Sequence, residues 1–192
     1  RQVNAGARPD VGRRVVVVGG GNTAMDCARA ALRLGAAVTV VYRRTRAEMP
    51  AIKDEVEEAE REGVDLAFLA SPVEFHVVNG RLRAVECERM ELGEPDASGR
   101  RRPVATGEHW LLPADTVLTA IGEASDLDAL PRNLARGDSG VRVDALGQTS
   151  DTAMFAGGDV TDAERTVADA LGAGKRAAIG IDRHLRIAAG ER

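Results

Sequence analysis

Strand and helix patterns alternate along the first part of the chain. Residues 13–18 read Arg-Arg followed by four valines, and Val38–Tyr42 is a second, mostly apolar run interrupted only by Thr39. Such runs, bounded by glycines, are typical of strands buried on both faces of a parallel sheet. Between them, Met25–Leu34 is rich in Ala, Leu and Arg, and Gly35 stands where a glycine commonly ends a helix. The pattern therefore predicts a βαβ unit.

A different pattern follows the charged helix predicted over Ile52–Glu62. Val64–Ala70 is typical of a short strand, and Asn79-Gly80 is a strong signal for a β-hairpin. The predicted antiparallel strands are Val73–Val78, Arg81–Met90 and residues 108–112. Between the last two, Glu91–Thr106 is polar and carries Gly, Pro and three consecutive arginines, which predicts an exposed loop. An antiparallel meander therefore interrupts the parallel pattern.

The parallel pattern then resumes. Asp115–Ile121 predicts another buried strand that ends at Gly122. Thr152–Ala156 is the last strand candidate, and a long helix is predicted over about Thr166–Ile187. Together the elements predict an α/β fold, in which a mostly parallel sheet carries a meander and is followed by a C-terminal strand and helix.

A glycine motif follows the first predicted strand directly. Gly19-x-Gly21-x-x-Ala24 opens the first helix, which is the context in which this pattern predicts a dinucleotide site. The first glycine permits the tight turn, the second lets the backbone approach a pyrophosphate, and the small third residue lets the helix pack closely. Asn22 and Thr23 offer additional side-chain donors. The alternative is a glycine-rich turn that binds no ligand.

The end of the second strand indicates which nucleotide is preferred. Sites for NAD usually carry an acid there to hold the ribose 2′-hydroxyl, but this chain has Tyr42 followed by Arg43 and Arg44. Two guanidinium groups favour a 2′-phosphate, which a carboxylate would repel. The pattern thus favours NADP(H) over NAD(H), the alternative for the arginines being a solvated basic turn.

A second candidate site follows the last predicted strand, where the chain reads Phe-Ala-Gly-Gly158-Asp159. The Asp159 carboxylate can accept a hydrogen bond from a hydroxyl of a sugar-like chain. The helix start near Thr166 and Val167 favours an anion or an electron-rich carbonyl. An acidic turn before a helix, with Asp159 near the cap, accounts for the same residues equally well. Spacing alone leaves these two interpretations open.

Composition excludes several classes of protein. The 192 residues are 44% hydrophobic and 29% charged with a net charge of −4, as in ordinary globular proteins, and only 3% are aromatic. We therefore expect neither a nucleic-acid partner nor a membrane partner. Cys27 and Cys87 are far apart, which favours a reducing, cytoplasmic location. The three histidines are scattered along the sequence and predict no metal site.

Several stretches, in order along nearly the whole chain, resemble the glutamate synthase small subunit family of NADPH- and flavin-dependent oxidoreductases. The corresponding part of dihydropyrimidine dehydrogenase is similar too. The matching stretches are Val15–Asp26, Val38–Arg44, Met49–Ala51, Glu55–Val64, Glu91–Arg101, Pro113–Gly122 and Phe155–Ala178.

The resemblance implies roles for particular residues. For NADP(H), it assigns the pyrophosphate and ribose to Gly19, Gly20, Gly21, Asn22, Thr23, Ala24 and Met25. It assigns the 2′-phosphate to Arg43 and Arg44, and the nicotinamide end to Ala120, Ile121 and Gly122. For FAD, it assigns the ribityl chain to Asp159, with Gly158 beside it, and the flavin ring to Thr166 and Val167. No catalytic side chain is implied, because the cofactors carry the chemistry.

The resemblance also implies how the chain is organised. It predicts a linker at residues 1–12 from a missing N-terminal FAD half, a Rossmann-like three-layer NADP(H)-binding domain at 13–122, and the C-terminal part of an FAD-binding domain at 123–192. The implied activity is hydride transfer from NADPH to FAD, with electrons passing onward to an iron–sulfur domain and a larger acceptor subunit. The alternatives are a thioredoxin reductase-like disulfide reductase, which the absence of a CxxC motif disfavours, and a non-catalytic NADP(H)-binding regulatory module.

Overall fold

The computed structural model describes residues 3, 5–95, 99–122, 125–162 and 166–190. The chain divides into two compact units, Arg1–Gly122 and Glu123–Arg192, which we describe one at a time. The predicted division into a linker, an NADP(H)-binding domain and part of an FAD-binding domain remains a prediction.

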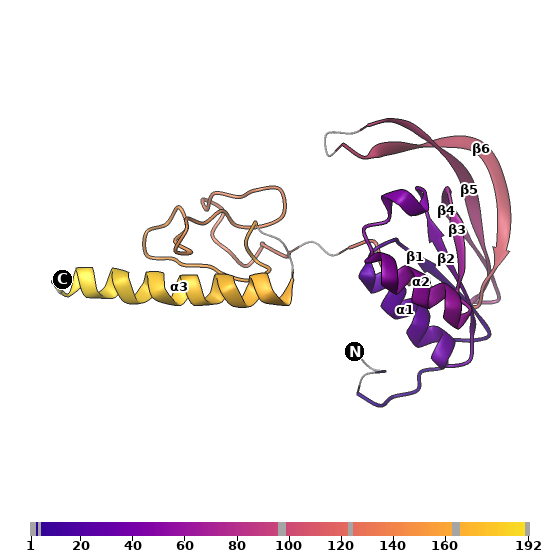
Figure 1. Cartoon of the computed structure of the whole chain (residues 1–192), viewed down its shortest axis with the longest axis horizontal. Helices are drawn as coiled ribbons and strands as arrows, with labels where there is room; N and C mark the ends of the chain where they lie inside the picture. Colours follow the sequence, from indigo (N-terminus) through magenta and orange to yellow (C-terminus); the bar gives the residue numbers. More distant parts are fainter. Residues whose placement is uncertain (1–2, 4, 96–98, 123–124, 163–165, 191–192) are drawn as a thin grey trace. The chain divides into compact units, whose positions relative to one another are not determined.

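The centre of the first unit is a four-stranded parallel sheet in the order β3-β2-β1-β7 (Figure 1). Its strands are β1 (Arg14–Val18), β2 (Ala37–Tyr42), β3 (Asp65–Phe68) and β7 (Thr116–Thr119). Side chains alternate between the two faces: Val15 and Val17 belong to one core cluster and Val16 to the other. Both faces are therefore covered, which explains the continuous valine run that predicted β1.

Helices cover one face of this sheet (Figure 1). The helical elements are α1 (Asn22–Arg33), the short 3₁₀ helix η1 (Arg46–Glu48) and α2 (Lys53–Glu62). The first helix begins three residues earlier than predicted, because Gly21 serves as its N-cap. The second ends at Gly63, whose φ of +105° is the left-handed conformation that favours glycine. Across the two helices, the Arg29 guanidinium pairs with three glutamates of α2.

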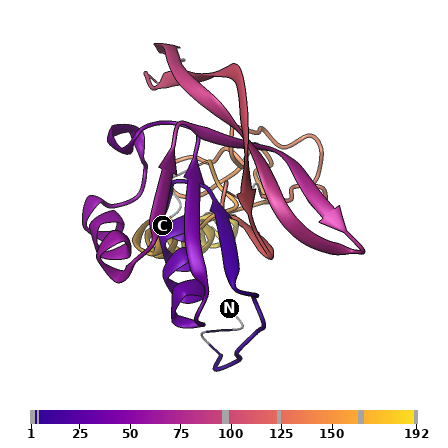
Figure 2. The same ribbon diagram turned by 90° about the vertical axis from the view of Figure 1, so that its right-hand side faces the viewer.

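An antiparallel meander covers the other face. Its strands β4 (Ala70–Val78), β5 (Arg81–Pro95) and β6 (Arg101–Pro113) pair in sequence order. Its buried residues Val85 and Cys87 pack in one cluster with Val16. Figure 2 shows the strands of the meander crossing those of the parallel sheet. The first unit thus has three layers, and the predicted α/β fold with a meander is confirmed.

The prediction of a loop over Glu91–Thr106 is wrong, because most of this segment belongs to paired strands. Glu91 pairs with Val104 and Leu92 with Pro103, so β5 and β6 extend into a long hairpin arm. The Arg101 side chain also donates hydrogen bonds to the Leu92 and Gly93 carbonyls. Most of the arm's side chains are exposed or half-buried, so backbone pairing holds it together without the alternating apolar pattern that reveals a strand in a sequence. Residues 96–98, which fall within the predicted loop, lie outside the described residues.

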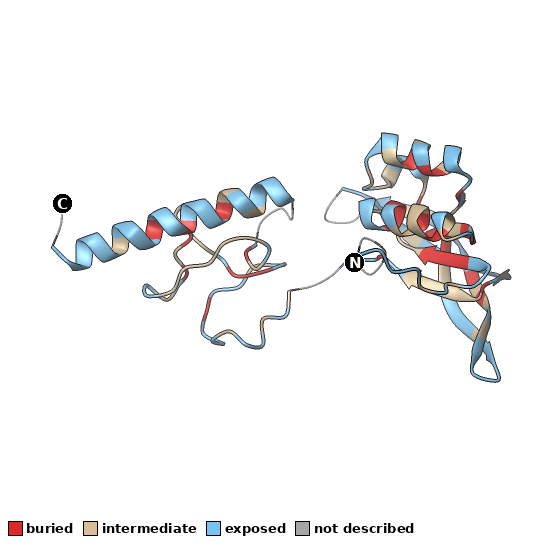
Figure 3. Ribbon diagram, turned by 90° about the horizontal axis from the view of Figure 1, so that it is seen from below, coloured by how far each residue is buried: buried red, intermediate tan, exposed pale blue. Residues whose placement is uncertain are grey.

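The second unit consists of connecting segments and one long helix, α3 (Val167–Ala188). The prediction of a strand over Thr152–Ala156 is wrong. The described residues there make one isolated bridge, from Phe155 to Gln148, and a strand needs several consecutive paired residues. The buried positions of α3 are Ala173, Ala177 and Gly180, and Figure 3 shows the rest of this helix largely exposed. No helix in the described part of the chain is long and apolar enough to span a bilayer.

Candidate dinucleotide site

A cleft of about 600 Å³ opens at the carboxyl ends of β1, β2 and β7 in the first unit. In open α/β sheets this edge is where ligands bind. Nine residues predicted from the sequence line the cleft: Gly19, Gly20, Gly21, Thr23, Arg43, Arg44, Ala120, Ile121 and Gly122. The structure therefore brings together three segments that are far apart in the sequence.

Packing within the protein requires two of the glycines. Gly19 has a φ of +146°, and a Cβ atom there would lie 2.3 Å from the Ala120 carbonyl oxygen. A Cβ atom at Gly20 would lie 2.5 Å from the ring of Tyr42. The Gly19 N–H also donates to the Val41 carbonyl at 3.1 Å, which ties the loop to β2. These two glycines therefore let the loop pass tightly between the ends of three strands.

Gly21 differs from its neighbours. Its φ of −92° suits any residue, and a Cβ atom there would meet no protein atom within 4 Å. The folded chain therefore does not itself require glycine at this position, although Gly21 lines the cleft. Among the described residues no side chain caps α1, and its first turn carries no acid. The positive end of this helix thus faces a space that can hold an anion such as a pyrophosphate.

The remaining motif residues support the loop from behind. The Asn22 Oδ1 atom accepts the Ile52 N–H at 2.8 Å, which joins the start of α1 to the start of α2. Ala24 and Met25 are fully buried in the helix-side core. The structure therefore places these three residues, which were candidates for cofactor contact, in positions that hold the loop and helix together.

Three arginines line the basic side of the cleft, one more than the sequence analysis proposed. Arg43 is exposed. Arg44 is only 4% exposed, and its Nε donates to the Arg101 carbonyl at 2.7 Å, so it also anchors the hairpin arm. The arm in turn supplies Arg100, which falls within the segment predicted as an exposed loop. The only sign of this role in the sequence was the run of three consecutive arginines, and the position of Arg100 at the cleft depends on the hairpin.

A carboxylate lies close to this basic region. Glu48 accepts hydrogen bonds from the hydroxyl of Thr45 at 2.7 Å and from its N–H at 3.1 Å. The pKa of Glu48 lies below its ordinary value, mainly because of the hydrogen bond from the Thr45 hydroxyl. The Thr45 N–H and the nearby positive charges of Arg101 and Arg44 lower it further. The Tyr42 hydroxyl donates to the Glu48 carbonyl at 2.7 Å. The acid is thus held by its own turn, a capping box at the start of η1.

The candidate flavin residues gather in the second unit. Asp159, Thr166 and Val167 line a cavity of about 630 Å³ together with Lys175 and small residues of α3. The Thr166 hydroxyl accepts the Asp169 N–H at 3.1 Å and so caps this helix. Gly158 is not among the lining residues; its φ is +81°, and its carbonyl accepts the Thr161 N–H and hydroxyl.

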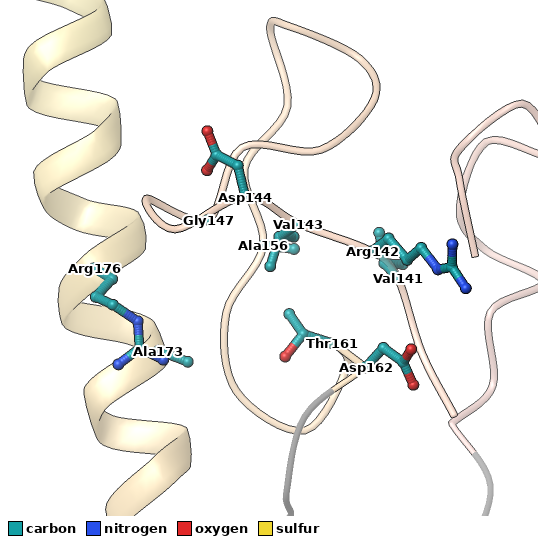
Figure 4. A pocket seen from close by; sticks show the side chains of 10 residues that line it. All are labelled: Val141, Arg142, Val143, Asp144, Gly147, Ala156, Thr161, Asp162, Ala173 and Arg176. Atoms are coloured by element: carbon teal, nitrogen blue, oxygen red, sulfur yellow. The ribbon is translucent and has the colours of Figure 1, made fainter. Parts of the chain in front are cut away.

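A separate cavity of about 390 Å³ in the second unit contains none of the predicted residues (Figure 4). Its charged lining residues are Arg142, Asp144, Asp162 and Arg176, two of each sign. Asp162 is engaged by the hydroxyl and N–H of Ser139, which lower its pKa. This cavity shows no preference for a charged ligand, so we do not assign it a cofactor.

The two cysteines lie in different places. Cys27 packs against the helix-side core, whereas Cys87 is buried in the meander-side core. Burial raises the pKa of both thiols, to about 11 for Cys87. Both are therefore protonated thiols at neutral pH, and the parallel sheet separates them.

A parallel sheet, a glycine loop opening α1 and a cleft at the carboxyl edge define the dinucleotide-binding class of α/β proteins. Within that class, residues 1–177 match the family described as pyridine nucleotide-disulphide oxidoreductase, and the chain belongs to this family. The predictions of an oxidoreductase and of this general family are confirmed.

Curated relatives and solved structures agree with this assignment. The β subunit of the NADP(+)-dependent formate dehydrogenase of Moorella thermoacetica is 49% identical over 191 residues, covering 97% of this chain and 27% of that protein. The glutamate synthase [NADPH] small chain of Escherichia coli is 40% identical over 186 residues, covering 92% of this chain and 39% of that one. FprA of Mycobacterium tuberculosis, solved with NADPH, has the same fold with a TM-score of 0.76 at 19% identity, covering 95% of this chain and 55% of that chain.

Proposed function

We propose that this chain binds NADP(H) in the cleft of its first unit and forms the NADPH-binding part of a larger flavin-dependent oxidoreductase. The observation that carries the proposal is that one cleft contains both the N-terminus of α1, which no described side chain caps, and the arginines at the end of β2. A pyrophosphate fits the first feature and a 2′-phosphate fits the second. The NADP(H) named for two of the relatives supports the same choice.

Each part of the cleft has a role in this proposal. The backbone around Gly21 and the Thr23 hydroxyl bind the pyrophosphate, while Arg43 binds the 2′-phosphate. Ala120–Gly122, after β7, lies beside the nicotinamide end. The cleft has no need of an acid or base, because its task is to hold the nicotinamide in one orientation.

The second unit contributes residues for the flavin in this proposal. The Asp159 carboxylate would accept a hydrogen bond from a hydroxyl of the ribityl chain. The start of α3 at Thr166 and Val167 would lie beside the flavin ring. FAD, when bound, supplies a ring that takes up hydride from NADPH.

The complete protein extends this function through partners. Because the chain spans only 27% and 39% of the length of two curated relatives, its full activity is a matter of proposal. We propose an N-terminal FAD half, an iron–sulfur domain and a larger acceptor subunit, through which electrons leave the flavin. A cytoplasmic location fits the two free cysteines.

A disulfide reductase is less well supported. Such an enzyme needs two cysteines that can exchange with a substrate disulfide, and at least one must be a reactive thiolate. Cys27 and Cys87 lie on opposite faces of the sheet with raised pKa values. We therefore favour electron transfer to a flavin over thiol chemistry by this chain.

Titration calorimetry of the chain with NADPH, NADH and FAD tests the proposal. We expect tight binding of NADPH, weaker binding of NADH, and weak or no uptake of FAD by this chain alone. Arg43→Ala should weaken NADPH binding about tenfold or more, since a charge-assisted hydrogen bond contributes about 1.5–3 kcal/mol, and should leave NADH unchanged. Arg81→Ala, at an exposed position of β5 outside the cleft, is the matched control. Equal affinity for the two nucleotides, or no binding of either, would refute the proposal.

A further inference from the structure

Five side chains that can bind a metal lie close together on the meander: Glu74, His76, Glu86, Glu88 and His109. They come from β4, β5 and β6. In β5, Val85 and Cys87 point into the core, so the alternating neighbours Glu86 and Glu88 point to the opposite face. The cluster therefore lies on the outer face of the meander, and it plays no part in the proposed nucleotide site.

The strand register brings this cluster together. Glu74 of β4 is the direct partner of Glu86 in β5, and Glu88 is the direct partner of His109 in β6. Two carboxylates directly opposite each other repel and destabilise a strand pair unless a positive charge lies between or beside them. The pairing of Glu74 with Glu86 thus favours a cation at this point.

The ligand atoms have a spacing that a small cation can bridge. One ligand atom from each of Glu74, His76 and Glu86 lies within 4.8 Å of the other two. The His76 Nε2 atom is 2.8 Å from the Glu86 Oε2 atom. Zinc holds nitrogen and oxygen ligands at about 2.0–2.2 Å, so small side-chain rotations are enough to close these three groups around one ion.

A second histidine orients the central carboxylate. The His109 Nδ1 atom lies 2.7 Å from Oε1 of Glu86, so the two oxygens of Glu86 contact different imidazoles. Bound carboxylates are commonly held by such an outer hydrogen bond, which fixes the direction of the ligand oxygen. His109 can therefore support Glu86 while Oε2 binds an ion beside His76.

We propose that Glu74, His76 and Glu86 form a binding site for a divalent transition metal of the zinc, cobalt or nickel type, with His109 as the positioning residue. One imidazole and two carboxylates suit these ions, whereas calcium takes six to eight oxygen ligands. The ion joins β4 to β5 and replaces the repulsion between Glu74 and Glu86 by attraction to one centre. The fourth position is left to water.

Zinc chloride titrated calorimetrically into the whole, chelator-treated chain tests this proposal. We expect one ion per chain. His109→Ala should weaken binding about 10- to 100-fold, and His76→Ala and Glu86→Gln, which remove a ligand, should each weaken it more than that. His184→Ala is the matched control, because the third histidine of the chain lies on α3 against Phe155 and should leave zinc binding unchanged.

A second measurement separates ligand loss from misfolding. Zinc should raise the melting temperature of the parent chain but not that of His76→Ala, and circular dichroism checks that each variant is folded. If His76→Ala does not fold, Glu74→Gln takes its place, and its zinc affinity should fall more than that of His109→Ala. Unchanged zinc affinity in the folded ligand variants, or an equal loss in His184→Ala, would overturn the proposal.

Discussion

At the scale of single residues, Gly21 offers the sharpest test of the nucleotide site. A Cβ atom there meets no protein atom within 4 Å, and φ is −92°, so Gly21→Ala should leave the fold intact. The added methyl group would, however, stand where we expect a pyrophosphate. We predict a loss of NADPH affinity of about 10-fold or more with an unchanged melting temperature.

Gly19→Ala is the informative contrast to Gly21→Ala. Its Cβ atom would lie 2.3 Å from the Ala120 carbonyl oxygen, and its φ of +146° disfavours any side chain. This variant should melt at a clearly lower temperature, because the backbone must shift. If Gly21→Ala binds NADPH as tightly as the parent chain, the pyrophosphate does not lie against this residue.

Asp115 provides a prediction about pH. Its carboxylate accepts the Arg13 and Arg14 N–H groups at 3.0 and 2.9 Å and pairs with the Arg14 guanidinium at 2.9 Å. These contacts, led by the Arg14 side chain, lower the pKa of Asp115 from 3.8 to about 2. Because the folded-state pKa is the lower one, this stabilisation is present above pH 4 and disappears as the pH falls toward 2.

Asp115→Asn should therefore lower the melting temperature at neutral pH, and its difference from the parent chain should shrink as the pH falls toward 2. Thermal unfolding followed by circular dichroism from pH 7 to pH 2 measures this. Asp65→Asn, at an exposed position at the start of β3, serves as the control. A difference between Asp115→Asn and the parent that is the same at every pH would contradict the mechanism.

At the scale of elements, the hairpin arm of β5 and β6 connects structure to specificity. It brings Arg100 to the cleft, and the hydrogen bond from Arg44 to the Arg101 carbonyl fastens it there. We predict that Arg100→Ala weakens NADPH binding about 3- to 30-fold with little effect on NADH, because a guanidinium favours the 2′-phosphate that only NADPH carries. Calorimetry with both nucleotides measures this.

Arg102→Ala is the control for that prediction, since Arg102 is exposed on the same arm but does not line the cleft. An equal effect of the two variants would mean that general positive charge on the arm, rather than the position of Arg100, sets the affinity.

The elements also show where sequence patterns succeed. The valine run of β1 predicted its strand because both of its faces are buried, and Asn79-Gly80 predicted the hairpin because both residues have positive φ. The outer half of the arm carried no such signal, since it is built by backbone pairing between exposed residues. The strand prediction around Phe155 was wrong for the opposite reason. The segment is apolar enough for a strand, but among the described residues it has only one bridge partner.

At the scale of the whole molecule, the cleft follows from the sequence more completely than any side-chain cluster. Gly19–Gly21 and Arg43 each follow a predicted parallel strand, and Ala120–Gly122 form the end of a third; such strand ends share one edge of a sheet. No comparable rule predicts the cluster of Glu74, His76 and Glu86 from the sequence. It depends on the register between two strands, which the sequence does not determine. For that reason the histidines seemed scattered in the sequence.

The division into two units leads to the last prediction. Among the described residues, those that line the cleft all lie within Arg1–Gly122, and so do both core clusters of buried residues. A chain truncated after Gly122 should therefore fold and bind NADPH within about twofold of the whole chain, because the first unit has its own core and its own cleft.

In the whole chain the two units should unfold separately. The second unit buries few apolar side chains, and its long helix exposes Val167, Leu171, Ile179 and Leu185, so we expect it to unfold at the lower temperature. A ligand stabilises only the unit that binds it, by about 2.7 kcal/mol at 100 times its Kd. Calorimetric melting with NADPH should therefore raise the upper transition and leave the lower one in place. If both transitions shift together, or if the truncated chain loses its affinity, the second unit takes part in NADPH binding and the site is not confined to the cleft.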